Sequence, residues 1–299
     1  MRVGNHEIVV TGKAVRIACF KSEWYKLVED PLSTIKALSH DNHGADIFTF
    51  AQKPPDIVPK YDYYMEWDNA AIIPIVDYES WWTKQTTKNN RKRVRKAQNR
   101  GIEIRHVEYN DEFIESIVKI YNETPVRQGR RFWHYGKSFE SVKKENSTFL
   151  ERTDFIGAYY NNELVGFIAL VYTGQCGDLM QILAKIEYRD KFTSNALIAK
   201  AVELCAQKNI KYLIYGNFFY GKKGADSLNI FKIRNGFQKM DFPRYYIPLT
   251  LRGKLALKFH LNRGLSEILP KFIVIFLLNM REKWYLLKYG THQDIPEEE

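Results

Sequence analysis

Two apolar runs joined by Asn161-Asn162 constrain the fold more than any other part of the sequence. The runs FIGAYY and ELVGFIALVY are rich in branched and aromatic residues, and the two asparagines between them suit a primed hairpin turn because asparagine tolerates a positive φ. A third such run, DLMQILA, follows, and SNALIAKAVELCAQ then repeats apolar residues at helical spacing before the apolar run YLIY. This order predicts an antiparallel meander, a crossover helix and a further strand.

The sequence on either side of this unit extends the pattern. An alternating strand, IEIRHVE, and an amphipathic helix, DEFIESIVKIYNET, precede it, and a second helix is expected over 138–145. A Gly- and Lys-rich loop, a helix SLNIFKIR that stops at Asn235-Gly236, and a final strand pair follow it. We therefore expect an α+β domain with one central mixed sheet over residues 101–250.

The two ends of the chain differ from this centre. Residues 1–75 contain short strand-like runs and a proline-broken loop, and a basic helix with Trp81 and Trp82 as anchors is expected from Glu79 to Gly101. Residues 251–299 form a basic, amphipathic helical tail by pattern. The predicted division is thus 1–100, 101–250 and 251–299.

Charge and apolar runs limit the partners of the chain. The net charge of +10 favours polyanions such as tRNA, a nucleotide cofactor or anionic lipid. The apolar run Phe272–Leu278 is far shorter than the ~20 residues that a membrane-spanning helix needs. The three cysteines show neither disulfide nor metal-ligand spacing, and the N-terminus lacks a secretion pattern. We expect a cytoplasmic protein that uses no metal.

The predicted order of elements resembles the GNAT acyltransferase fold. In KIEYRDKFTSNALIAKAV, Arg189 would take the first position of the GNAT donor motif, whose small residues let backbone N–H groups approach a pyrophosphate. Phe192 and Ser194 replace those small residues. The resemblance implies donor binding by Arg189, Thr193 and Ser194, although a bulky Phe192 would crowd the binding site of coenzyme A.

Two further segments resemble the FemABX aminoacyltransferases, which are doubled GNAT folds. FKIRNGF, from Phe231 to Phe237, is similar to the Phe-Lys-x-x-x-Gly segment near the end of those enzymes, and the basic stretch from Trp81 is similar to the helix before their second GNAT unit. The resemblance implies that residues 1–100 hold a degenerate first GNAT half. It also implies transfer of an amino acid from aminoacyl-tRNA to an amine of a peptidoglycan precursor. Acyl-CoA stays open as the alternative donor.

The candidate site residues follow from this reading. The loop between the first two helices would bind the acceptor, because arginines recognise phosphate or carboxylate and aromatic rings suit a sugar, a base or an acyl chain; its candidates are Arg127, Gln128, Arg130, Arg131 and Tyr135. His134 in this loop could act as general base. Gln181 occupies the place where many GNAT enzymes keep a glutamate, so Glu187 is a second candidate base.

The remaining candidates lie near the expected end of the sheet. Asn217, Tyr220, Lys222 and Lys223 follow the strand after the crossover helix, where a GNAT sheet splays to admit the donor. Lys232 in FKIRNGF would stabilise charge in the transition state, or else be a solvated lysine.

Two classes of function are consistent with these residues. The first is an N-acyltransferase that moves an acyl or aminoacyl group to an amine, such as that of a cell-envelope precursor. The second is a catalytically degenerate GNAT module that binds RNA or anionic lipid. The basic tail suggests peripheral contact with anionic membrane at its inner face, whereas the alternative is a helical pair that packs on the acyltransferase unit.

Overall fold

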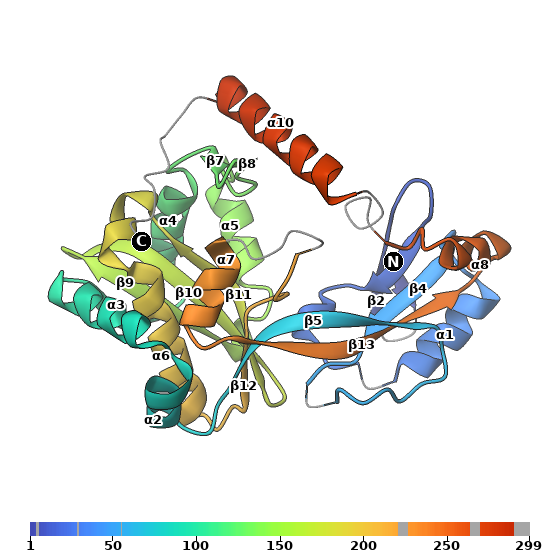
Figure 1. Ribbon diagram of the computed structural model, residues 1–299, viewed down its shortest axis with the longest axis horizontal. Coiled ribbons are helices and arrows are strands. Elements are labelled where there is room, and N and C mark those ends of the chain that lie inside the picture. Colours follow the sequence, from blue (N-terminus) through green and yellow to red (C-terminus); the bar gives the residue numbers. More distant parts are fainter. Residues whose placement is uncertain (4–5, 29, 55, 221–226, 264–269, 290–299) are drawn as a thin grey trace.

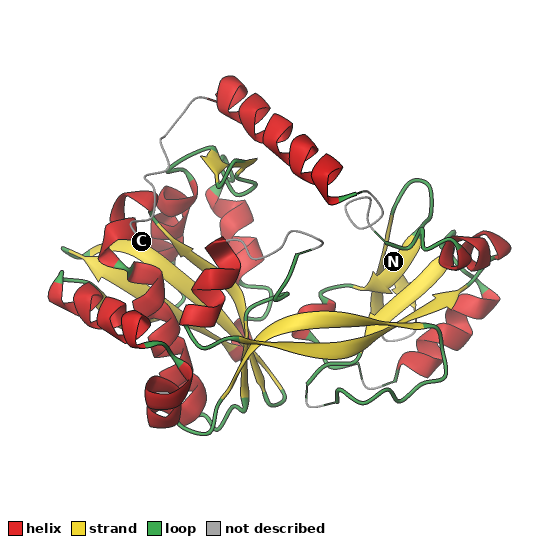
Figure 2. Ribbon diagram, in the orientation of Figure 1, coloured by secondary structure: helices red, strands yellow, loops and turns green. Residues whose placement is uncertain are grey.

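The computed structural model describes residues 1–3, 6–28, 30–54, 56–220, 227–263 and 270–289. Eleven of its strands form one mixed sheet that runs from one end of the molecule to the other (Figures 1 and 2). In order across the sheet the strands are β1 (Arg2–Val3), β2 (His6–Thr11), β3 (Ile17–Phe20), β4 (Ile47–Ala51), β13 (Gln238–Pro248), β5 (Met65–Pro74), β12 (Tyr212–Ile214), β11 (Cys176–Ala184), β10 (Glu163–Thr173), β9 (Thr153–Tyr160) and β6 (Glu103–Val107).

Helices cover both faces of the sheet. They are α1 (Pro31–His40), α2 (Tyr78–Ser80), α3 (Lys88–Asn99), α4 (Asp111–Tyr121), α5 (Phe139–Asn146), α6 (Thr193–Gln207), α7 (Ser227–Arg234), α8 (Leu251–Lys258) and α10 (Lys271–Tyr289). Shorter helical turns are η1 (Glu23–Tyr25), η2 (Trp81–Gln85), η3 (Leu150–Arg152) and η4 (Ile186–Lys191), and a separate hairpin joins β7 (Val126–Arg127) to β8 (Arg130–Arg131).

The predicted hairpin is confirmed at the centre of the fold. Tyr160 pairs with Glu163, so Asn161 and Asn162 form a two-residue turn, and their φ angles are 50° and 63°. Both angles are positive, as a primed turn requires. Strands β9 and β10 then carry the core: α3 and α6 pack on one face of this sheet region, and α4 and α5 pack on the other. The α+β fold with a mixed sheet is therefore as expected.

The sheet divides the molecule into two lobes joined by long strands. β5 lies between β12 and β13, and β13 pairs with β4 over Arg244–Pro248 and with β5 over Gln238–Tyr245. Figure 1 shows these two strands crossing from the lobe of α6 to the lobe of α1. The three-part division of the chain stays a prediction, since residues from both sides of residue 100 contribute to one continuous sheet.

The basic helix begins later than expected. Trp81 lies in the short turn η2, and α3 starts at Lys88, not at Glu79. The reason is a cap: Thr87 has extended backbone angles, and its hydroxyl accepts a hydrogen bond from the Asn90 N–H at 3.2 Å. The indole of Trp81 is fully buried and donates to the carbonyl of Asn235 at 2.9 Å. Trp81 therefore anchors this segment as predicted.

Three buried asparagines tie the basic helix to the rest of the lobe. Asn195 of α6 donates to the Asn90 side chain at 2.6 Å, and Asn90 donates to the Asn235 side chain at 3.1 Å. Asn235 follows α7, and Gly236 after it has a φ of 89°, which a residue without Cβ adopts freely. This network holds α3, α6 and the end of FKIRNGF in fixed relation, with Phe237 in the core.

The described part of the tail is helical, as predicted. Gly253 of α8 packs so closely on β4 that an added Cβ would lie 2.0 Å from the Asp46 carbonyl oxygen. Helix α10 runs along the upper edge of the molecule in Figure 1 and contacts the β7–β8 hairpin. No helix among the described residues is both long enough and apolar enough to cross a membrane.

Candidate functional site

The sheet opens between β11 and β12. These strands are parallel, but they pair only from Cys176 with Tyr212 to Asp178 with Ile214. Beyond Asp178, β11 continues to Ala184, and the register of its pairing with β10 shifts so that Met180 is an extra residue. The two strands therefore separate at Asp178, and the segment 215–220 leaves the sheet at this point.

Lys232 lies beneath this opening and is fully buried. Its ammonium group donates to the Asn217 carbonyl at 2.6 Å, and it lies 4.7 Å and 4.9 Å from the ring centroids of Tyr215 and Tyr220. A buried cation held by a carbonyl and two aromatic faces is a strong local charge. The alternative of a solvated lysine is therefore wrong.

A chain of charged side chains continues from Lys232 to the other lobe. Asn217 donates to Asp68 of β5 at 3.2 Å, Arg244 of β13 donates to Asp68 at 2.9 Å, and the same guanidinium donates to Glu23 at 3.0 Å. The backbone carbonyl of Glu23 accepts a hydrogen bond from Lys53, whose Nζ lies 4.8 Å from the ring centroid of Trp24. We name the set Glu23, Lys53, Asp68, Asp178, Lys232 and Arg244 the junction cluster.

Asp178 differs from the other members of this cluster. It is 4% exposed, and among the described residues its carboxylate has no hydrogen bond or ion pair, although Lys53 and Arg152 are near enough to attract it. Burial raises the pKa of Asp178 to about 7, against the attraction of these two cations. Burial also lowers the pKa of Lys53 to about 8. Asp178 can therefore take up and release a proton near neutral pH.

Tyr25 is a partly buried phenol within electrostatic range of Asp178 and Tyr220. Burial, followed by the nearby charges of Asp178 and Tyr220, raises the pKa of the Tyr25 phenol to about 12. Tyr220 also contacts the Lys232 ammonium, and Asn217, which accepts a hydrogen bond from that ammonium, follows Ile214, the partner of Asp178 in the sheet. The strands thus part at a buried acid–base group, Asp178, and the segment that leaves the sheet there binds the Lys232 ammonium.

His134 forms a second polar cluster on the same face of β11. Asp178 lies opposite Val171 and Gln181 lies opposite Ala169, so both side chains point to one face. The Gln181 amide meets His134 at 3.1 Å, and the Lys137 ammonium lies 3.4 Å from the other ring nitrogen of His134. Burial, Lys137 and Arg127 lower the pKa of His134 to about 4. His134 is therefore neutral at pH 7 and a weaker base than free histidine.

The predicted acceptor loop forms the β7–β8 hairpin, with Gln128 and Gly129 at its turn. Arg127 donates to the Ala184 carbonyl at 3.0 Å and pairs with Glu123, whose carboxylate also accepts the N–H of Glu187 at 3.1 Å. Arg127 and Glu187 are thus brought to the far end of β11, where Glu187 is exposed. Of the acceptor-binding candidates in this loop, four are exposed: Gln128, Arg130, Arg131 and Tyr135.

The predicted donor-binding turn before α6 has an unusual conformation. Phe192 adopts a left-handed φ of 56°, and three cations from α3 and its C-cap lie near its ring: Arg93 at 5.3 Å, Lys96 at 6.0 Å and Arg100 at 5.7 Å from the centroid. Phe192 thus keeps the backbone angle that a glycine would supply but fills the space with a ring. The neighbouring Thr193 is buried, Ser194 is partly buried and Arg189 is exposed.

The candidates do not all meet at one place. Asn217, Tyr220 and Lys232 converge at the opening, whereas Arg189, Thr193 and Ser194 lie at the start of α6, and Lys222 and Lys223 lie outside the described residues. Sequence analysis did not find Lys53 or Asp178. The sequence does contain a sign of Asp178, because this aspartate begins the apolar run DLMQILA. Burying a charge in a strand is costly, so such a residue is a candidate for a functional role.

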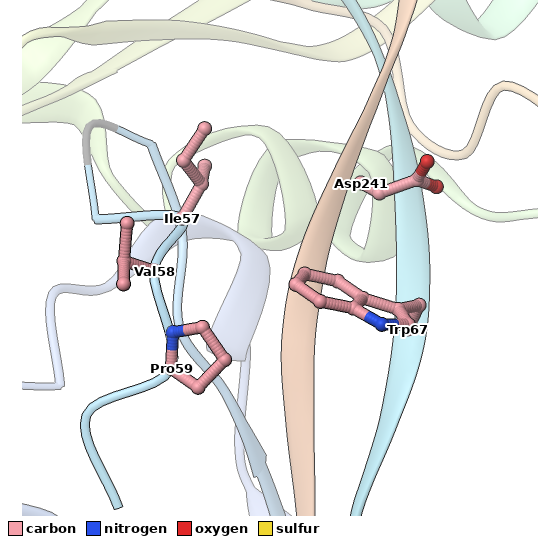
Figure 3. Close-up of a pocket in the computed structure, with 5 residues that line it drawn as sticks. All are labelled: Ile57, Val58, Pro59, Trp67 and Asp241. Carbon is pink, nitrogen blue, oxygen red and sulfur yellow. The ribbon is translucent and has the colours of Figure 1, made fainter.

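A shallow open pocket lies on the joining strands. Figure 3 shows that Trp67 of β5 and Asp241 of β13 line it together with Ile57, Val58 and Pro59 of the preceding loop. The Asp241 carboxylate is paired with Lys239 at 2.7 Å. None of its lining residues belongs to the junction cluster, and we assign it no role in the chemistry.

This chain is similar to known proteins in structure, whereas its sequence matches none of the families or curated proteins compared. No protein-family model matches the sequence, and no curated protein matches it. FemX matches with a TM-score of 0.56 at 11% identity, over 85% of this chain and 86% of its own. The C-terminal domain of a putative lysylphosphatidylglycerol synthetase from Agrobacterium fabrum matches with a TM-score of 0.56 at 13% identity, over 86% of each chain.

A third structure, L-PGS from Bacillus licheniformis, has a TM-score of 0.54 at 11% identity and covers 92% of this chain and 86% of its own. These matches span both lobes, so the N-terminal lobe belongs to the shared architecture. At such identities the likeness establishes the fold and leaves the reaction open. The chain therefore has the FemX-like arrangement of the GNAT fold that its sequence predicts.

Proposed function

We propose that the protein is an N-acyltransferase that moves an aminoacyl group from aminoacyl-tRNA to an amine. The observation that carries this proposal is the opening between β11 and β12: the strands part at Asp178, whose buried carboxylate has no hydrogen bond or ion pair among the described residues, and the segment that leaves the sheet there binds the buried Lys232 ammonium. An amine that attacks an ester needs a base for its proton and a positive charge near the developing oxyanion, and these two groups meet those needs.

The reaction proceeds as a direct transfer. The acceptor nitrogen attacks the acyl carbonyl carbon, the carbon–nitrogen bond forms, and the ester bond breaks, so that the tRNA ribose leaves as a free hydroxyl once its oxygen receives the proton that the nitrogen has lost. Asp178 takes the proton that the nitrogen loses, because a pKa of about 7 places it near the optimum for such transfer. Lys232 contributes a fixed positive charge near the carbonyl oxygen. His134 and Glu187, the bases suggested by the sequence, are the competing candidates.

The turn at Phe192 supports a tRNA donor. A coenzyme A pyrophosphate would need the space that the Phe192 ring fills, whereas the cations Arg93, Lys96 and Arg100 can face phosphates of a larger polyanion. The implied amine acceptor is a cell-envelope molecule, by the resemblance to FemABX enzymes. The alternative function, a non-catalytic module that binds RNA or anionic lipid, predicts the same binding without turnover.

The test compares donors before any acceptor is known. Aminoacyl-tRNA at 100 times its dissociation constant should stabilise the protein by about 2.7 kcal/mol in thermal unfolding, whereas acetyl-CoA should have no effect. Turnover is then measured as loss of labelled amino acid from tRNA when envelope-precursor extracts are added. Binding without acceptor-dependent loss would favour the binding module, and stabilisation by acetyl-CoA alone would reject the tRNA donor.

Two variants test the assignment of the donor surface. Arg93→Gln with Arg100→Gln should weaken tRNA binding and lower its dependence on salt, since each lost phosphate contact reduces the slope by about one. Phe192→Gly keeps the left-handed turn and opens the space, so it should bind acetyl-CoA better than the parent protein does. Lys239→Gln, an exposed cation on β13, is the matched control and should leave tRNA binding unchanged.

A further inference from the structure

Helix α10 has a row of large apolar side chains that points to solvent. Its members are spaced four and three residues apart and are 73%, 62%, 55%, 51% and 87% exposed: Phe272, Phe276, Met280, Trp284 and Leu287. At 1.5 Å per residue this outer stripe is about 22 Å long. Isolated exposed apolar residues are ordinary, but a continuous row of this length marks a contact surface.

The opposite side of α10 faces the body of the protein. Val274 is buried there, and Leu278, Tyr285 and Tyr289 are partly buried. Glu282 lies against the backbone of Gly129, so that an added Cβ on Gly129 would come within 2.5 Å of the Glu282 carboxyl group. No hydrophobic core cluster of the described residues includes a residue of α10. The outer stripe therefore contributes nothing to the core, and the fold does not explain it.

Basic residues flank the outer stripe. At 100° per residue, Lys283 lies near one edge of the apolar arc, between Phe272 and Phe276, and Lys288 lies just beyond Trp284 at the other edge, with its ammonium 4.7 Å from the Trp284 ring centroid. Residues 251–290 contain eight Lys or Arg and two Glu. An apolar stripe bordered by lysines, with tryptophan among its members, has the composition of a helix that lies in the interface of an anionic membrane.

Helix α8 repeats this arrangement on the other lobe. Leu251, Leu255 and Phe259 are exposed in a row, while Ala256 and Leu257 pack against Ile47. The exposed cations Arg252, Lys254 and Lys258 lie beside the row. Two separate helices thus present apolar rows among cations: in Figure 1, α10 lies along the top of the molecule and α8 at its right-hand end.

We propose that α10, assisted by α8, docks the protein onto an anionic membrane surface, with the outer stripe entering the headgroup region and the lysines facing lipid phosphates. A second copy of the chain is a poorer occupant, because it would bring two strongly basic helices together. A membrane-spanning role is excluded for α10 by its charged residues Arg281, Glu282, Lys283 and Lys288. Docking does not depend on the proposed reaction.

The test is flotation of the full chain with vesicles. Vesicles of phosphatidylglycerol mixed with phosphatidylcholine should carry the protein, and vesicles of phosphatidylcholine alone should carry much less. Phe276→Ser with Trp284→Ser should lower the affinity for the mixed vesicles at least about tenfold, since each ring loses its burial in lipid. Lys283→Gln with Lys288→Gln should lower that affinity about tenfold and leave binding to the neutral vesicles unchanged.

Trp67→Ser is the matched control, because Trp67 is an exposed tryptophan that lies on β5, outside both helices. It should float like the parent protein. Thermal unfolding of the Phe276→Ser/Trp284→Ser variant should match the parent, which separates loss of docking from loss of fold. Absence of the parent protein from both kinds of vesicle would overturn the proposal. A dimer in solution that this double variant abolishes would also overturn it and assign the stripe to a second copy.

Discussion

Two polar clusters lie on the same face of β11 and differ in how completely they are satisfied. In the cluster of His134, Gln181, Lys137 and Glu145, each side chain meets a partner: Gln181 meets His134 at 3.1 Å, and Lys137 pairs with Glu145 at 2.7 Å. In the junction cluster, the Asp178 carboxylate meets none among the described residues. A satisfied network fixes a structure, whereas an open buried carboxylate is free to act on a bound group.

The two clusters also differ in the proton affinity of their central residues. Burial moves the pKa of Asp178 upward to about 7 and that of His134 downward to about 4. Both shifts favour the neutral form, but their consequences at neutral pH are opposite. Asp178 is poised to exchange a proton, while His134 stays neutral and acts as a hydrogen-bonding side chain.

The largest expected effect belongs to Asp178→Asn, which keeps the shape and removes the base. The rate constant of transfer should fall about 10²- to 10⁴-fold. In the parent protein kcat/KM should rise with pH through about 7, as Asp178 loses its proton, and this rise should be absent from the variant. Steady-state kinetics across pH 5.5–8.5 provide the measurement. An intact pH profile in the variant would return the role of base to His134 or Glu187.

Lys232→Met should have the next largest effect. It keeps the length of the side chain and removes the charge beneath Asn217, so kcat should fall about 10²- to 10³-fold. Removal of a buried charge together with its solvation cost should change the unfolding free energy by less than about 2 kcal/mol. Lys239→Met, at an exposed lysine, is the control. If Lys232→Met keeps its turnover, the active site must be sought at Arg127, Arg130 and His134.

The sequence predicted the local parts of this site better than the distant contacts. The turn at Asn161-Asn162, the apolar face of α6 and the anchoring of Phe237 follow from patterns within a few residues. The contact of β5 with both β12 and β13 joins residues more than 130 positions apart, and no local pattern encodes it. Lys53 and Asp178 come near each other only in the folded chain, so the sequence alone does not predict their shifted pKa values.

His134→Gln should affect stability more than catalysis. The folded-state pKa of about 4 lies below the ordinary 6.5, so between these values the unfolded chain binds more protons and the parent protein loses stability as pH falls. Between pH 6.5 and 4 this titration should lower the unfolding free energy of the parent protein by up to about 3 kcal/mol. The variant should not show this decrease, because the glutamine does not titrate. Urea unfolding at several pH values measures it. A similar loss in the variant would show that other groups cause it.

The catalytic activity of His134→Gln also distinguishes the two clusters. At pH 7.5 His134→Gln should keep kcat within about tenfold of the parent, since a glutamine can still bond to Gln181 and the histidine was already neutral. A fall of 10²-fold or more, together with an unaltered Asp178→Asn variant, would exchange the roles that we propose. The pair of variants therefore decides between the clusters whichever way the result falls.

Glu187→Gln should have the smallest effect, although the sequence named Glu187 as a candidate base. Its side chain is exposed in η4, and it is the backbone N–H of this residue that is held, by Glu123. An exposed carboxylate stays solvated, so its loss should alter stability by at most about 0.5 kcal/mol. Turnover should stay within about threefold of the parent. Glu123→Gln is the informative contrast, because Glu123 joins Arg127 to the end of β11 and its neutralisation should destabilise the protein by about 1–3 kcal/mol. If Glu187→Gln instead abolished turnover while Glu123→Gln did not, the reacting groups would lie at the far end of β11, and the opening at Asp178 would have to be given up as the site.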